Sequence, residues 1–251
     1  MSAHALPLLY VVMLWFMSTA LVVALDHRAR GRMVLTFAGA AACAALAVIG
    51  LLAPSTDAFA AYASFTAALI IWGWHELSFL TGAVTGPRRT ALPEGATGWT
   101  RLRLSAATVI HHELAIAVTL ILLVIVSRGL PNQTGAAAFA ILFAMRLSTK
   151  FNIFLGVPNF STEMLPPQLA YLQSYFRHSR FNLLMPVSLI AGTALTLGLG
   201  NRALAMPGDA AIGYTLLAAI ALLGVVEHLF LVLPIGDTAL WRWAIPNAKR
   251  I

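Results

Sequence analysis

Charged side chains are scarce in this chain of 251 residues. Only 10% of the residues are Asp, Glu, Lys or Arg, 60% are hydrophobic, and the mean hydropathy is +0.84. Soluble globular domains carry about 25% charged residues. The composition therefore excludes a soluble globular protein and predicts an integral membrane protein in contact with the lipid bilayer.

Cysteine and uninterrupted basic stretches are also lacking. The single cysteine, Cys43, lies in an apolar alanine-rich run and cannot form a disulfide within the chain, so we expect it to be a small buried hydrophobe. The net charge of +7 comes from basic residues that lie between hydrophobic runs and do not form one continuous face. A nucleic acid is therefore not predicted as a partner.

The common catalytic motifs are missing too. The chain has no nucleotide-binding glycine-rich loop, no nucleophile elbow, no CxxC and no HExxH. His75-Glu76 and His112-Glu113 begin like HExxH but lack the second histidine, which argues against a standard intramembrane zinc protease. The Glu-x-x-His spacing of di-metal helix bundles and the His-rich boxes of membrane desaturases are absent as well.

Seven apolar runs are long enough to cross a bilayer, which takes about 20 residues. They cover residues 7–25, 33–53, 58–80, 104–127, 135–156, 182–200 and 211–233. No basic residue precedes the first run, so we expect a retained helix and not a cleaved signal peptide. Arg146 and Lys150 interrupt the fifth run, which predicts either an end near residue 147 or side chains that snorkel to the surface. The predicted fold class is an all-α polytopic membrane bundle, with residues 1–251 forming a single domain.

The distribution of basic residues predicts the orientation. With seven spans, fourteen of the sixteen Lys and Arg fall on one side, and only Arg128 and Arg202 fall on the other. Because basic residues are retained on the cytoplasmic side, we expect a cytoplasmic C-terminus and an outer, periplasmic N-terminus.

Two cytoplasmic segments are longer than turns. Residues 81–103 are rich in glycine and proline, which predicts a loop. Residues 156–181 contain Pro166-Pro167, a pair that can open a helix, followed by apolar residues at helical spacing. The apolar residues are Leu169, Leu172, Tyr175 and Phe176. This pattern predicts a helix that lies in the membrane interface.

Three of the five glutamates lie inside apolar runs, each beside a histidine. The groups are His75-Glu76, His111-His112-Glu113 and Glu227-His228. At 1.5 Å per residue, all of them lie roughly 6–14 Å below the cytoplasmic boundary. We therefore expect the three groups to meet at one depth in the cytoplasmic half of the bundle.

Several kinds of chemistry suit such a cluster. Imidazole and carboxylate together ligate iron, manganese or zinc, and the candidate metal ligands are His75, Glu76, His111, His112, Glu113, Glu163, Glu227 and His228. One histidine alone can ligate the magnesium of a chlorophyll-type pigment or a haem iron, and the candidates for this cofactor role are His112, His111, His75 and His228. A proton relay or a polar pocket for a substrate head group is a third interpretation. The simplest alternative is that each pair only hydrogen-bonds internally and fixes helix packing.

A longer pattern resembles a known family. It runs from Phe151 to Asn159 (FNIFLGVPN), continues with EMLP and LAYL, and is joined by WHELSFLTG, HHELAI and NLLMPVS. These stretches are similar to the PuhE family, the photosynthetic complex assembly proteins of purple and related anoxygenic phototrophic bacteria. The resemblance covers about residues 60–235 and is densest at 146–188.

The resemblance implies a multi-pass protein of the bacterial inner, intracytoplasmic membrane. It implies a role in assembling the reaction centre and core antenna or in balancing bacteriochlorophyll supply against them, with complex subunits or pigment-synthesis proteins as partners. It transfers no catalytic residue. The alternative function is a membrane metalloenzyme that acts on a lipid-soluble pigment or its precursor, and a transporter is a weaker third reading because the outer half of the bundle lacks charged residues.

Overall fold

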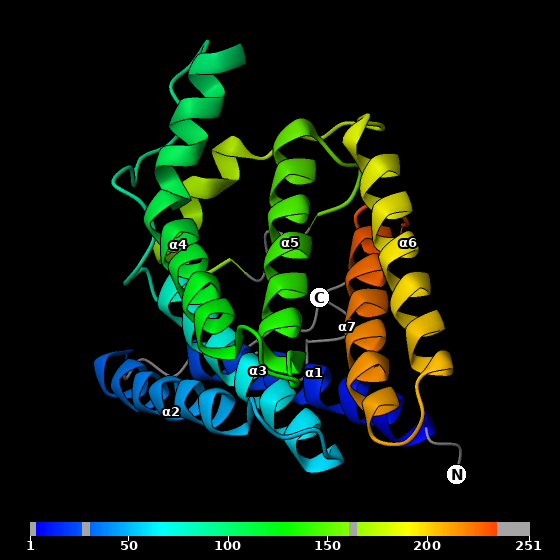
Figure 1. The fold of residues 1–251 in the computed structure, drawn as a ribbon. Coiled ribbons are helices and arrows are strands. Elements are labelled where there is room, and N and C mark those ends of the chain that lie inside the picture. Colours follow the sequence, from blue (N-terminus) through cyan, green and yellow to red (C-terminus); the bar gives the residue numbers. More distant parts are fainter. Residues whose placement is uncertain (1–3, 27–30, 161–164, 235–251) are drawn as a thin grey trace.

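The computed structural model describes residues 4–26, 31–160 and 165–234, which are mainly helical (Figure 1). The described parts contain no strand, seven α-helices and one 3-10 helix. The α-helices are α1 (Ala5–Asp26), α2 (Gly31–Leu52), α3 (Ala58–Leu80), α4 (Gly98–Ser127), α5 (Thr134–Leu155), α6 (Leu184–Ala205) and α7 (Ala210–Phe230), and the 3-10 helix is η1 (Pro167–Tyr175).

Each predicted apolar run corresponds to one α-helix. Six of the helices, all except α3, are long and apolar enough to cross a membrane, so the chain is a multi-pass membrane protein. The largest difference in bounds is at α4, which begins at Gly98 and not near residue 104. The extra residues lie above the neighbouring helices in Figure 1.

Helix α5 occupies the middle of the bundle, with α4 on one side and α6 and α7 on the other (Figure 1). Helix α3 packs against α1, α2, α5 and α7, and twelve of its 23 residues are buried. The core includes Phe65, Ile116, Leu123, Phe139 and Leu216. Because about half of α3 is buried in protein, it can carry polar side chains such as Ser64, His75 and Ser78 that a lipid-facing helix could not.

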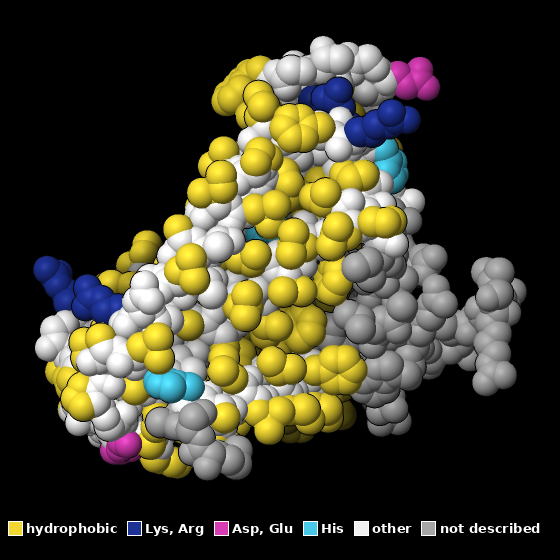
Figure 2. Space-filling view, turned by 90° about the vertical axis from the view of Figure 1, so that its right-hand side faces the viewer, with side chains coloured by type: hydrophobic (Ala, Val, Ile, Leu, Met, Phe, Trp, Pro, Cys, Tyr) yellow, Lys and Arg dark blue, Asp and Glu magenta, His cyan; other side chains and the backbone are white. Residues whose placement is uncertain are grey.

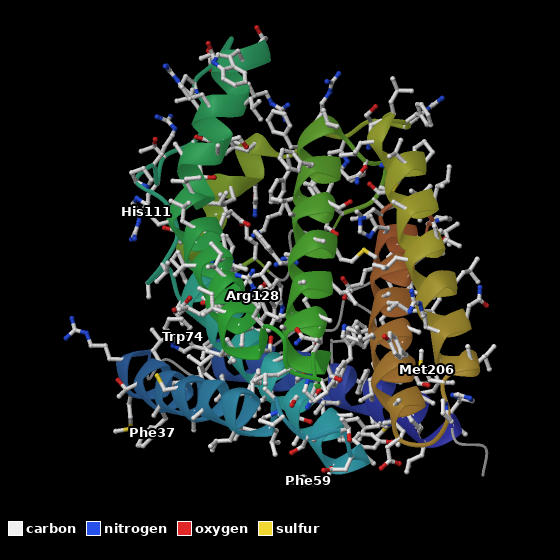
Figure 3. The ribbon with its side chains drawn as sticks, viewed as in Figure 1. Phe37, Phe59, Trp74, His111, Arg128 and Met206 are labelled. Carbon is white, nitrogen blue, oxygen red and sulfur yellow. The ribbon has the colours of Figure 1, made fainter. Side chains whose placement is uncertain are left out.

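The outer surface is apolar, as a bilayer requires. Figure 2 shows hydrophobic side chains over the middle of one face, with Lys and Arg gathered at its ends. Phe37 and Phe59 are 69% and 70% exposed and project from α2 and α3 (Figure 3). Cys43 on α2 is exposed too, so the predicted burial of this residue is wrong. Helix α2 uses its other face to pack against α3, and an exposed thiol is tolerated in lipid because it is apolar.

The segment that contains Pro166-Pro167 differs from the predicted interfacial helix. It forms η1, a 3-10 helix with three residues per turn, and the buried residues Leu169, Leu172 and Tyr175 follow that period. Leu169 and Leu172 pack against Phe79 of α3. The apolar face of η1 therefore contacts the protein, and η1 covers the C-terminal end of α3. Residues 161–164, which include Glu163, lie outside the described residues.

Candidate functional site

The three glutamates predicted to meet converge around Arg146 of α5. The Arg146 Nη2 atom donates to Glu76 Oε2 of α3 at 3.0 Å. Arg146 also interacts electrostatically with Glu227 of α7 and Glu113 of α4. Helix α5 thus places one guanidinium in contact with a glutamate of α3 and within electrostatic range of glutamates on α4 and α7.

Lys150 lies one turn further along α5 and pairs with Glu113. Its ammonium also lies 5.2 Å from the centroid of the Phe79 ring. The predicted end of the fifth span near residue 147 is therefore wrong. Helix α5 continues to Leu155, and its two cations form ion pairs with glutamates of α3 and α4. We call Glu76, Glu113, Arg146, Lys150 and Glu227 the charged centre.

Glu227 has a different kind of partner. Its Oε1 atom accepts a hydrogen bond from the indole N–H of Trp15 in α1 at 3.1 Å. Among the described residues, Glu76 and Glu113 make the only two carboxylate ion pairs within salt-bridge distance. The third carboxylate of the charged centre is therefore held by a neutral donor.

Two histidines lie together beside the charged centre. The rings of His75 and His112 are 6.3 Å apart, and both side chains are almost completely buried, at 1% and 0% exposed. His75 Nε2 lies 2.9 Å from the hydroxyl of Thr119. Both ring nitrogens of His112 are buried without a hydrogen-bond partner, and the ring packs against Phe79 at 4.7 Å.

The other two candidate histidines are separate from this pair. His228 lies in the α5–α7 contact, where Nδ1 donates to the Gly224 carbonyl and Nε2 is 2.9 Å from the Ser148 hydroxyl. His111 is exposed and projects outward from α4 (Figure 3). Adjacent residues on a helix diverge by about 100°, so three successive residues cannot all face the bundle. Only five of the 30 residues of α4 are buried, and its inward face takes His112 and Glu113 while His111 points away.

The charged centre is not completely enclosed by protein. The Arg146 and Lys150 side chains remain 38% and 23% exposed, and those of Glu76 and Glu113 remain 14% exposed. Several buried polar atoms nearby have no hydrogen-bond partner within the protein: Glu76 Oε1, Glu113 Oε2, Arg146 Nε, His75 Nδ1 and both His112 nitrogens. Most buried polar groups in proteins do have a partner, so this part of the bundle is unusual.

A loop fixes the part of α4 that carries His112 and Glu113. The backbone N–H of His112 donates to the carbonyl of Thr85, at 2.9 Å, and the N–H of Arg88 donates to the carbonyl of Ala107, at 3.1 Å. Gly86 lies between these two bonds. A Cβ on Gly86 would lie 2.2 Å from the Ala107 oxygen, so only glycine permits this approach. The loop predicted from glycine and proline content thus orients the site.

A metal ion or a flat pigment would need changes to this arrangement. Among the residues that the structure describes, no three His, Cys, Asp or Glu side chains are placed to hold a metal ion, and two of the carboxylates are paired with cations. A macrocycle on His112 would need the contact between α3 and α4 to open, because that ring is enclosed. Of the candidate pigment ligands, His111 is the histidine whose imidazole ring is exposed on the outside of the bundle. The metal and pigment assignments of these histidines and glutamates stay predictions.

Arg146 and Lys150 were not predicted to belong to the site, because basic residues were interpreted as topology signals. Two cations one turn apart inside an apolar run are nevertheless a signal in themselves. Intramembrane charges are rarely left unpaired, so these residues could have been matched with the buried glutamates. Trp15 gave no such signal, because an indole in an apolar run is ordinarily a packing residue.

Comparisons with known proteins show the family to which the chain is related. Residues 1–251 match the family described as "Protein of unknown function (DUF3623)". The chain is 40% identical over 193 residues to a Rhodobacter capsulatus protein, with 75% of this chain and 69% of the relative covered. That relative is described as an uncharacterized 30.4 kDa protein in the puhA 5' region. No solved structure matches the chain.

Proposed function

We propose that this chain, which belongs to the DUF3623 family, is a membrane factor that supports assembly of the photosynthetic reaction centre and core antenna, or adjusts bacteriochlorophyll supply to them. The observation that carries the proposal is the position of the Rhodobacter capsulatus relative, which is described as a protein of the puhA 5' region. The similarity of residues 60–235 to the PuhE family supports the same assignment.

The proposal includes a location and an orientation. The protein lies in the bacterial inner, intracytoplasmic membrane with seven spans, a periplasmic N-terminus and a cytoplasmic C-terminus. The placement of fourteen of the sixteen basic residues on one side supports this orientation. In this topology α3 is the seventh helix that crosses the membrane, and its neighbours shield much of it from lipid.

The charged centre is the functional core in this proposal. It lies at the same depth on α3, α4, α5 and α7, and ionisable groups inside a membrane protein mark functional sites by default. Subunits of the photosynthetic complexes or pigment-synthesis proteins are the proposed partners. The loop before α4, which contains Gly86, and the helix η1 lie on the side of the bundle from which a nascent subunit or a pigment carrier would approach.

The test uses a phototrophic bacterium that lacks its own homologue and carries this chain as the complementing copy. The near-infrared absorbance of membranes measures assembled reaction centre and core antenna. We expect the wild-type chain to restore both, and His112→Ala combined with Glu113→Ala to restore neither. Glu94→Gln is the control, because Glu94 is exposed in the loop before α4 and belongs to none of the candidate sites. Wild-type complex levels in the double variant would contradict the proposed role of the site.

The second candidate is a membrane metalloenzyme that acts on a lipid-soluble pigment or its precursor. The specific observation in its favour is the adjacency of His75 and His112, with free ring nitrogens beside three carboxylates. A precursor that accumulates in the deletion strain, together with a stoichiometric metal lost in Glu113→Ala, would support this candidate. If neither result is obtained, the assembly role is favoured over the metalloenzyme.

A further inference from the structure

Three segments at one end of the bundle are joined by arginine side chains. Arg88 Nε, in the loop before α4, donates to the hydroxyl of Tyr175 in η1 at 2.6 Å. Arg101 Nη2, in α4, donates to the carbonyls of Tyr175 and of Phe154 near the end of α5, both at 2.8 Å. We call the loop, the start of α4 and the segment around η1, which are residues 81–97, 98–104 and 165–183, the arginine cap.

The positive charge of the arginine cap is not balanced by protein. Its arginines are Arg88, Arg89, Arg101, Arg103, Arg177 and Arg180, and its one carboxylate is that of Glu94. Both carboxylate ion pairs within the described residues lie in the charged centre. The arginines of the cap therefore have no carboxylate partner in the part of the chain that the structure describes.

The six arginines occupy two kinds of position. Arg88 and Arg101 are half-buried and bond to neutral oxygens, and the Arg101 guanidinium also lies 4.0 Å from the centroid of the Phe154 ring. The other four are exposed, and within the described residues their guanidinium groups have no hydrogen bond to protein: Arg89, Arg103, Arg177 and Arg180. A free guanidinium presents a planar fork of N–H donors that matches the oxygens of a phosphate group.

Large apolar side chains are exposed beside these arginines. Trp99 is 77% exposed at the start of α4, and Phe181 and Leu183 are 63% and 80% exposed just after the cap's last arginine. Figure 2 shows hydrophobic side chains next to Lys and Arg at the end of the molecule where α4 projects. Exposed aromatic residues mixed with basic residues at the ends of spanning helices are typical of the membrane interface.

The height of the cap agrees with this position. Helix α4 begins at Gly98, whereas its apolar run begins near residue 104, and at 1.5 Å per residue the difference is about 9 Å. The headgroup region adds about 5–8 Å on each side of the hydrocarbon core. Trp99 therefore lies among the headgroups, and Arg103 lies at the hydrocarbon boundary, where its side chain can reach the phosphates.

We propose that the arginine cap binds the headgroups of anionic phospholipids. The four exposed arginines bind the phosphate groups through paired N–H donors, and Trp99, Phe181 and Leu183 lie against the glycerol groups and upper acyl chains. Clusters of about four to eight Lys and Arg beside a spanning helix are typical of anionic lipid recognition. An acidic protein segment would match the charge but would leave the exposed apolar side chains without a partner. This lipid partner goes beyond the proposed role in assembly and does not depend on it.

Native mass spectrometry of the purified full-length chain in detergent measures the lipids that remain bound. Phosphatidylglycerol and phosphatidylcholine are titrated separately, and we expect phosphatidylglycerol to bind more tightly because the choline group neutralises the phosphate of the other lipid. Arg103→Gln combined with Arg177→Gln should weaken phosphatidylglycerol binding by about tenfold or more. Both side chains are exposed, so the contacts of Arg88 and Arg101 that join the cap are kept.

Arg128→Gln combined with Arg202→Gln is the matched control, because both residues are exposed at the opposite end of the bundle and the change in net charge is the same. The control should bind phosphatidylglycerol as the wild-type chain does. Equal affinity for the two lipids, or an equal loss in the control, would overturn the proposal. Displacement of bound phosphatidylglycerol by inorganic phosphate or by a glutamate-rich peptide at the same concentration would also overturn it, because the cap would then take a soluble anion. If the first variant does not fold, Arg89→Gln combined with Arg180→Gln provides the same test.

Discussion

At the residue scale, the cations of α5 account for the cost of placing glutamates inside a membrane. Arg146 and Lys150 lie four residues apart, so they share one face of the helix. Each contacts one glutamate, Glu76 on α3 or Glu113 on α4. Removing one member of such a pair leaves a charge without compensation, which destabilises a protein more than removing both members.

A double-mutant cycle tests the pair between Lys150 and Glu113. We expect Lys150→Met to lower the free energy of unfolding more than Lys150→Met combined with Glu113→Gln, with a coupling of about 0.5–3 kcal/mol. Denaturant unfolding in detergent micelles measures the difference. Arg128→Gln is the control, because Arg128 is exposed at the end of α4 (Figure 3). Additive effects would show that the two charges act independently.

Adjacent histidines provide a second residue-scale prediction. His112→Ala should cost about 2–5 kcal/mol of stability, as truncation of a large buried side chain does. His111→Ala should change stability by less than about 0.5 kcal/mol, because that side chain is exposed. Thermal unfolding of both variants measures the contrast. Equal losses would mean that His111 also has an interior role.

At the element scale, the loop before α4 determines where the site residues lie. The loop bonds through its backbone to Ala107 and His112, within a few residues of Glu113. This contact depends on Gly86, whose hydrogen atom faces the backbone of Ala107 and Thr108. The loop is therefore part of the site, although it carries no side chain of the charged centre.

Gly86→Ala tests this dependence. The added Cβ would meet backbone atoms at 2.2 and 2.6 Å, so the loop must move, and we expect a loss of about 1–3 kcal/mol, as overpacking produces. Gly50→Ala is the matched control, because a Cβ there meets nothing within 4 Å. Thermal stability in detergent distinguishes the two. Wild-type stability of Gly86→Ala would mean that the loop is not held tightly against α4.

The sequence predicted the helices better than it predicted their contacts. Hydropathy located all seven α-helices, because lipid selects long apolar runs. It could not show that α3 is enclosed or that His111 faces outward, since those facts depend on the order of helices in the bundle. The partners of Arg146 and Lys150 could not be predicted either, because they also depend on which helices are neighbours. The 3-10 period of η1 was readable in the spacing of Leu169, Leu172 and Tyr175 but was interpreted as an interfacial helix.

At the scale of the whole molecule, the proposed seven-span orientation rests on the distribution of basic residues and can be tested by labelling. In a Cys43→Ser background, we expect Arg128→Cys in spheroplasts to react with a membrane-impermeant maleimide and Glu94→Cys to stay unlabelled. Both positions are exposed, so access depends only on the side of the membrane. Labelling of Glu94→Cys alone would reverse the orientation, and labelling of both or neither would require a different number of spans between them.

The most direct test of the central claim, that the ion pairs of the charged centre carry the function, is a charge exchange. The measurement is the near-infrared absorbance of the assembled complexes in the complemented deletion strain. We predict that Glu113→Lys and Lys150→Glu each abolish recovery of that absorbance, and that the two together restore it in part, because the exchange recreates the pair between α4 and α5. Full recovery with either single exchange, in a chain present at the wild-type level, would contradict the claim.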